Sequence, residues 1–146
     1  MYPSQIRQEI LRSQRSILQR FEVLEALASA PCPVTAEALR TRSAELVPQL
    51  IAHIQLDDTL LAPALADTDA WRAFRIERLE AHHDHQREGI LQLITQLTDE
   101  SADAEGLCQL IRSLAATLKR DFDEEARLML SSDVLRDDVI SLGVGA

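Results

Sequence analysis

Several residue types are scarce in this sequence, and each scarcity excludes a class of protein. Aromatic residues make up 3% of the chain, and there are only four glycines and five prolines among 146 residues, which leaves little for a β-sheet and its turns to use. Acidic residues outnumber basic ones, giving a net charge of −9. This balance argues against a nucleic-acid partner, because clustered Lys and Arg supply most of the affinity for phosphates.

Long apolar runs are also missing, and no charged segment followed by an apolar stretch opens the chain. We therefore predict neither a membrane span nor a signal peptide, and we expect a cytoplasmic protein. Only two cysteines are present, Cys32 and Cys108, and their spacing matches no zinc motif. We expect both to be reduced, but a disulfide between them stays open because both fall at the same end of the architecture predicted below.

The residues that are abundant, chiefly Ala, Leu, Glu, Gln and Arg, favour helices, and 46% of the chain is apolar. A chain of this length can bury one core without disulfides. We predict an all-α protein with one domain over residues 1–146 and a core over about 5–130. Four amphipathic stretches joined by short turns are typical of an antiparallel up-down-up-down four-helix bundle. A short helix from about 132 to 142 is expected in the acidic C-terminal segment 131–146.

The ends of the predicted helices follow from local signals. The first helix covers about 4–28, Thr35 and Thr68 are expected to cap the second and third, and the fourth opens near Asp103. Pro48 lies inside the second helix and predicts a kink or a restart there. The negative charge is concentrated after residue 50, where nineteen acidic residues face nine basic ones.

Each predicted helix carries an apolar stripe that is interrupted by polar residues near its middle. In the second helix His53 and Asp57 stand four residues apart within the stripe, ahead of Leu60, and the same spacing recurs in the fourth helix. Residues at this spacing share one face of a helix. The residues predicted to face the interior are Gln14, His53, Asp57, His83, Asp121 and Glu125.

The three nearby histidines of the third helix do not all point to one face. By helical spacing His83 faces inward, His82 flanks the stripe and His85 faces outward. Buried ionisable groups are costly unless they are paired or bind a metal. The inward-facing set therefore predicts either a metal site or a hydrogen-bonded network that keeps the geometry of such a site without its ion.

Residues 50–65, LIAHIQLDDTLLAPAL, closely resemble the second-helix signature of the hemerythrin-like family, the HHE cation-binding bundles, including its downstream proline. The resemblance covers about residues 5–130. It implies a four-helix bundle whose members hold a di-iron centre with a His from the first helix, His-x-x-x-Glu from the second, a His from the third and His-x-x-x-Glu from the fourth.

Several ligand positions of that family are substituted here. Matched to the family pattern, Gln14 replaces the first His, Asp57 replaces the second-helix Glu and Asp121 replaces the fourth-helix His. The matching residues that remain are His53, His83 and Glu125, and Arg87 stands where some members have a further His. Two imidazoles and three carboxylates form a donor set that suits iron or manganese. This set lacks the histidine-rich environment that the family's reversible dioxygen carriers have.

Two functions compete on this basis. The sequence favours a non-catalytic binding or regulatory module that acts through protein contact or self-association, with an internal metal site depleted of histidine. The alternative is a carboxylate-rich site for iron, mononuclear or dinuclear, or for manganese, which senses metal, dioxygen or nitric oxide. Catalysis ranks third, since the sequence contains no Ser-His-Asp, Cys-His or Gly-rich phosphate pattern.

Overall fold

The fold is built from helices throughout the part of the chain that the computed structural model describes, residues 1–29 and 33–137. Within those ranges there is no β-strand, so the all-α prediction is confirmed. The elements are α1 (Pro3–Ala28), α2 (Pro33–Leu56), the π-helix η1 (Asp57–Leu61), α3 (Ala62–Ala66), α4 (Arg72–Thr98) and α5 (Ala104–Leu128).

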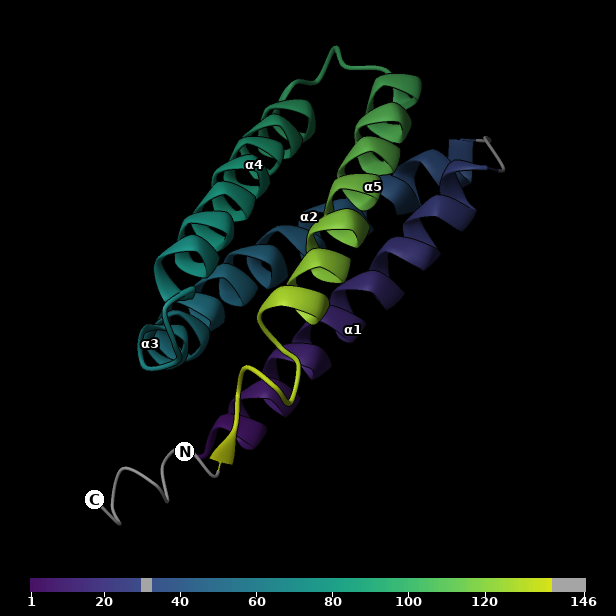
Figure 1. The fold of residues 1–146 in the computed structure, drawn as a ribbon. Helices are drawn as coiled ribbons and strands as arrows, with labels where there is room; N and C mark the ends of the chain where they lie inside the picture. Colours follow the sequence, from purple (N-terminus) through teal and green to yellow (C-terminus); the bar gives the residue numbers. More distant parts are fainter. Residues whose placement is uncertain (30–32, 138–146) are drawn as a thin grey trace, which may run out of the picture.

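The four long helices form a bundle (Figure 1). Helix α1 contacts α2 and α5, and α4 contacts the same two helices, so that each long helix has two long neighbours. In Figure 1 the chain reverses direction between α1 and α2 and again between α4 and α5. None of the described helices is both long and apolar enough to cross a membrane.

Two of the three expected N-terminal caps are wrong. Helix α2 already includes Thr35, because Pro33 occupies its first position, where a missing N–H costs nothing. Helix α4 begins at Arg72 with Trp71 as the capping residue, and the Thr68 hydroxyl instead donates to a carbonyl at the end of α3. Asp103 does cap α5, where its carboxylate accepts a hydrogen bond from Gly106 N–H.

The helical irregularity in the second segment occurs later than Pro48. Helix α2 continues through that proline to Leu56, and the bonding changes in η1, where Ala62 N–H donates to the Asp57 carbonyl five residues back. A π turn holds one more residue than an α turn. This shift corrects the prediction that Leu60 follows Asp57 on the inner face, because the fully buried residue is Leu61.

The segment after α5 does not begin the expected helix at Ser132. Residues 129–135 form turns and bends, and the predicted stretch from 138 to 142 lies outside the described residues. The segment is tied to the start of α1, since Ser4 donates both its N–H and its hydroxyl to the Asp137 carboxylate. Cys108 is buried as a free thiol, and Cys32 lies outside the described residues.

A polar layer divides the interior into two apolar clusters. One cluster includes Ile17, Leu50 and Leu118, and the other includes Ile10 and Met129. On each long helix buried polar residues lie between members of one cluster and members of the other, whereas the buried Ser43 lies within the first cluster. The residues of this layer are the six expected to face inward, Gln86 from the predicted inner stripe of the third helix, and His82, which was expected only to flank that stripe: Gln14, His53, Asp57, His82, His83, Gln86, Asp121 and Glu125.

Candidate metal centre

Three buried side chains at the middle of the polar layer could hold one cation. A ligand atom from each of His53, Asp57 and Glu125 lies within 4.8 Å of the other two. His53 reaches this position from the end of α2, Asp57 from the first residue of η1 and Glu125 from the last turn of α5. The Nδ1 atom of His53 lies 2.7 Å from Ser13 Oγ, and this contact fixes the orientation of the ring.

Two atoms of this group lack a hydrogen-bond partner among the described residues, although both are buried: His53 Nε2 and Asp57 Oδ1. The 3.4 Å contact between His53 Nε2 and Asp57 Oδ2 does not have hydrogen-bond geometry. Buried polar atoms are nearly always satisfied, and the exceptions call for a cause such as an ion. Both orphaned atoms belong to the group that is compact enough for a cation.

The protonation of this group suits a cation as well. Burial lowers the pKa of His53, and this outweighs the opposing effect of the Asp57 carboxylate, so the imidazole is neutral at neutral pH. Burial raises the pKa of Glu125 to about 7, against a lowering by its hydrogen bond to His82. A neutral imidazole can donate a lone pair to a metal, and Glu125 sheds its proton readily near neutral pH.

His83 connects Asp57 to the surface. Its Nε2 lies 3.1 Å from Asp57 Oδ2 and its Nδ1 lies 3.2 Å from Asp58 Oδ1. Asp58 is half-exposed, and its Oδ2 lies 3.5 Å from Arg87, whose other nitrogen lies 3.6 Å from Asp84. Consecutive residues of an α-helix point about 100° apart, and the wider π turn of η1 lets both aspartates reach one imidazole. We call Arg87, Asp58, His83 and Asp57 the Arg87 network.

His82, about 100° further around α4, makes an equivalent connection to α5. Its Nδ1 lies 2.9 Å from Glu125 Oε2, and its Nε2 lies 3.3 Å from Glu124 Oε1. Arg78 holds Glu124 with two hydrogen bonds, of 2.6 and 2.9 Å. Burial lowers the pKa of His82, but the nearby carboxylates, led by Glu125, outweigh it and raise that pKa overall. We call Arg78, Glu124, His82 and Glu125 the Arg78 network.

The remaining expected residues are buried but lie beside the central group. Asp121 accepts a hydrogen bond from Gln86 at 3.3 Å, and its other oxygen lies 3.8 Å from His82. Gln14 donates to Glu125 Oε1 at 3.1 Å. Sequence reasoning missed His82, which is as buried as His83 because it contacts Glu124 and Glu125 of α5, while His83 contacts Asp57 and Asp58 of η1. The missed signal was its spacing, four residues before the inward-facing Gln86.

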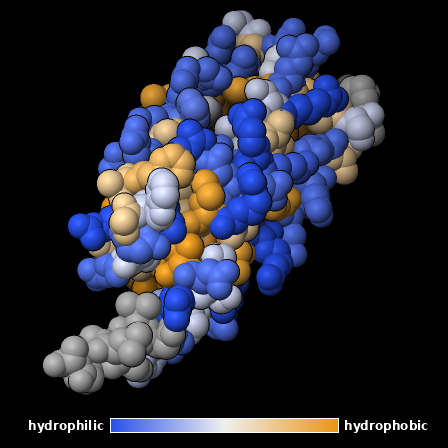
Figure 2. All heavy atoms as spheres, in the orientation of Figure 1, coloured by the Kyte–Doolittle hydropathy of each residue, from blue (hydrophilic) through white to orange (hydrophobic). Residues whose placement is uncertain are grey.

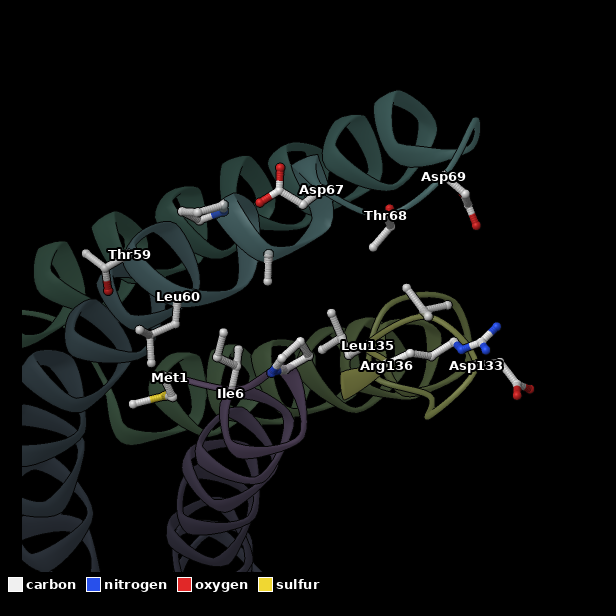
Figure 3. A pocket seen from close by; sticks show the side chains of 14 residues that line it. Met1, Ile6, Thr59, Leu60, Asp67, Thr68, Asp69, Asp133, Leu135 and Arg136 are labelled. Carbon is white, nitrogen blue, oxygen red and sulfur yellow. The ribbon is translucent and has the colours of Figure 1, made fainter. Parts of the chain in front are cut away.

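A cavity lies away from this polar layer. It measures about 620 Å³, and Ile6, Leu60, Leu135 and Asp67 are among the residues that line it (Figure 3). Figure 2 shows hydrophobic atoms gathered on this face between α3 and the end of α5. None of the buried polar residues lines the cavity, so the group with metal-ligand chemistry is not part of it.

Comparison with known proteins gives one match. A model of the hemerythrin HHE cation-binding domain matches residues 5–131. Searches of curated proteins and of solved structures returned no match.

Proposed function

Because this chain belongs to the hemerythrin HHE cation-binding family, we propose that it is a cation-binding module in which His53, Asp57 and Glu125 hold one ion. The antiparallel up-down-up-down bundle expected for the family would bring these three residues together from the second and fourth helical segments. Iron is the cation we propose first and manganese second, because two carboxylates and one imidazole form an oxygen-rich donor set that suits both.

The orphaned atoms carry this proposal. A cation between His53 Nε2 and Asp57 Oδ1 would satisfy both at once, and Glu125 would complete the set. Ser13 supports the assignment, because a ligating histidine usually bonds through its other ring nitrogen to a nearby oxygen that fixes the tautomer. With His53 Nδ1–H donating to Ser13, the lone pair of Nε2 faces the site.

The bound ion would supply positive charge and open coordination positions, and the protein residues would bind and orient it. His83 stands next to the set through Asp57, and Asp121 stands next to it through His82. We propose a regulatory role without a catalytic step, in which occupancy of the site reports metal, dioxygen or nitric oxide status. The histidine positions substituted by Gln14 and Asp121 argue against reversible dioxygen carriage.

A second candidate function is a metal-free bundle that acts through protein contact. One observation favours it: both oxygens of Glu125 already have partners, Gln14 and His82. In that case the polar layer is a structural network, and the protein works through a partner or a second copy of itself. The two orphaned atoms are what this candidate leaves unexplained.

Titration of metal-free protein with ferrous ion under anaerobic conditions separates the two candidates. We expect one equivalent to bind and to raise the melting temperature, and Asp57→Asn or Glu125→Gln to weaken binding by more than ~100-fold, since even outer partners of metal ligands are worth ~10 to 100-fold. Asp123→Ala, which removes an exposed carboxylate of α5, is the matched control. Wild-type protein that shows neither heat nor stabilisation would establish the metal-free candidate.

The pH dependence gives an independent check. Binding requires the anionic form of Glu125, whose pKa burial raises to about 7. Affinity should therefore fall as the pH drops through 7, and binding near neutral pH should release a proton. Isothermal titration in two buffers of different ionisation enthalpy measures that proton. A pH-independent affinity between 6 and 8 would exclude Glu125 as a ligand.

A further inference from the structure

The two surface ion pairs above the polar layer differ in how firmly they close it. Arg78 grips Glu124 through two short hydrogen bonds, and the Glu124 side chain is only 20% exposed. Arg87 reaches Asp58 at 3.5 Å, and the side chains of both are about half-exposed, at 52% and 51%. Long, exposed pairs of this kind contribute little to stability, so the Arg87 pair opens more easily than the shorter, two-point Arg78 pair.

Arg87 also has a second carboxylate partner. Its second terminal nitrogen lies 3.6 Å from the carboxylate of Asp84, one turn earlier on α4, and that carboxylate is largely exposed. When Arg87 releases Asp58 it can keep this second partner, so its charge stays paired. Arg78 has a hydrogen-bonded partner only in Glu124 among the residues that the structure describes.

A surface groove lies beside the Arg87–Asp58 pair. A groove of about 410 Å³ runs between α2 and α4, and Asp58 and Arg87 line it together with Ile51, Ile90 and Leu91. Its remaining lining residues are Ile54, Gln55 and Ile94. Asp58 and Arg87 are the charged residues of this lining, so an incoming cation would meet them first.

Behind this pair a single side chain, His83, lies between the half-exposed Asp58 and the candidate site. His83 touches the half-exposed Asp58 with Nδ1 and the buried Asp57 with Nε2. Asp57 is the residue whose second oxygen lacks a partner. A half-exposed carboxylate, a buried imidazole and a buried carboxylate thus follow one another from solvent to the orphaned atoms.

We propose that Asp58 and Arg87 form the entrance to the buried site, with Asp58 capturing the cation once Arg87 moves to Asp84. This inference rests on the proposed cation site and adds the route by which an ion reaches it. Asp58 acts on the rate of exchange, because it faces solvent and His83, whereas the affinity is set by His53, Asp57 and Glu125.

The first test measures how fast a cation enters. Co²⁺ is a convenient probe because its visible absorbance changes on binding, and stopped-flow mixing follows the change. Asp58→Asn keeps an oxygen for His83 and removes the charge, and we expect association to slow by ~10-fold, the lower end of what a local charge contributes to on-rates. Dissociation should slow alongside it, leaving the equilibrium affinity within about twofold, and Arg87→Ala should accelerate both rates.

Lys119→Ala is the matched control. Lys119 is 51% exposed and pairs across helices with Glu25, but this pair is made between α5 and α1, on another face. Its removal should leave the rates unchanged. Unchanged rates in Asp58→Asn would overturn the entrance, and a loss of affinity without a change in association rate would make Asp58 a ligand instead.

The second test needs no metal. Diethyl pyrocarbonate modifies accessible neutral imidazoles, and peptide mass spectrometry can resolve the modification of each histidine. In metal-free protein Arg87→Ala should raise the modification rate of His83 several-fold, while His82 behind the Arg78 pair stays protected. Equal rates at His83 in wild type and variant would overturn the entrance. Failure of wild-type protein to bind Co²⁺ or ferrous ion would instead overturn the proposed function, and the cation as occupant with it.

Discussion

The Arg78 and Arg87 networks have the same order of groups, an arginine, a carboxylate, a histidine and a buried carboxylate, yet they differ in tightness. The Arg78 network runs through contacts of 2.6 to 3.3 Å with a mostly buried middle carboxylate, and the Arg87 network runs through contacts of 3.1 to 3.5 Å with a half-exposed one. Two adjacent histidines of one helix thus belong to a tighter and a looser network. The two networks differ most in the exposure of the middle carboxylate, which is mostly buried in the Arg78 network and half-exposed in the Arg87 network.

Replacing the histidines should give the largest difference in stability between the two networks. His82→Leu leaves the buried Glu125 with Gln14 as its one partner, while Glu124 keeps Arg78, and we expect a loss of about 3 kcal/mol in the free energy of unfolding. His83→Leu should cost less, about 1–2 kcal/mol, because Asp58 can turn to water. Urea denaturation of both variants without metal measures the difference. A larger loss for His83→Leu would reverse the assignment of the tighter network.

The response to pH should sharpen the contrast, since the Arg78 network contains the groups whose pKa rises. The folded pKa of Glu125 is about 7 against an ordinary 4.5, so the folded state binds more protons between these values and stability falls as pH rises through them. His82, with its raised pKa, acts in the same direction at higher pH. His53 opposes both, because its lowered pKa costs stability as pH falls below 6.5.

Glu125→Gln isolates that contribution. The difference in unfolding free energy between wild type and this variant should decrease by on the order of 2 kcal/mol from pH 5 to pH 8. Denaturation curves for the two metal-free proteins at each pH give this difference, in which contributions common to both cancel. A flat difference across that range would mean that Glu125 is hydrated, contrary to its burial.

The arginines should give the smallest effects. Arg78→Ala removes a two-point hydrogen-bonded pair at a mostly buried carboxylate and should lower the melting temperature measurably. Arg87→Ala should change stability by less than about 0.5 kcal/mol, because its contacts are long and exposed. Thermal denaturation of the two variants side by side provides the comparison. Equal costs would remove the physical basis for a movable entrance.

Helical periodicity identified most of the polar layer before any coordinates, because spacings of three and four residues place side chains on one face. Gln14, His53, Asp57, His83, Asp121 and Glu125 are all buried as expected. Periodicity assigns a helix a single inner stripe, however, and α4 is covered from two sides, so the burial of His82 depended on tertiary packing. The pairing of His83 with Asp57 and of His82 with Glu125 likewise depends on tertiary packing.

The errors at helix ends have local causes. Thr35 and Thr68 have good capping side chains, but proline at the start of α2 and the turn of residues 67–71 before α4 fixed those ends elsewhere. The π turn could not be inferred from an apolar pattern because leucine stands at both 60 and 61. Either residue could face the interior, and only the hydrogen bond from Ala62 to Asp57 decides between them.

That π turn also bears on how sequences of this family should be aligned. A single π turn is equivalent to an α-helix that has gained one residue and absorbed it locally, with both flanks left in register. Deleting one residue between 58 and 60 should therefore restore continuous α-helical bonding while Asp57 and Leu65 keep facing inward. Relatives without the turn should be one residue shorter between the second-helix histidine and the proline that corresponds to Pro63.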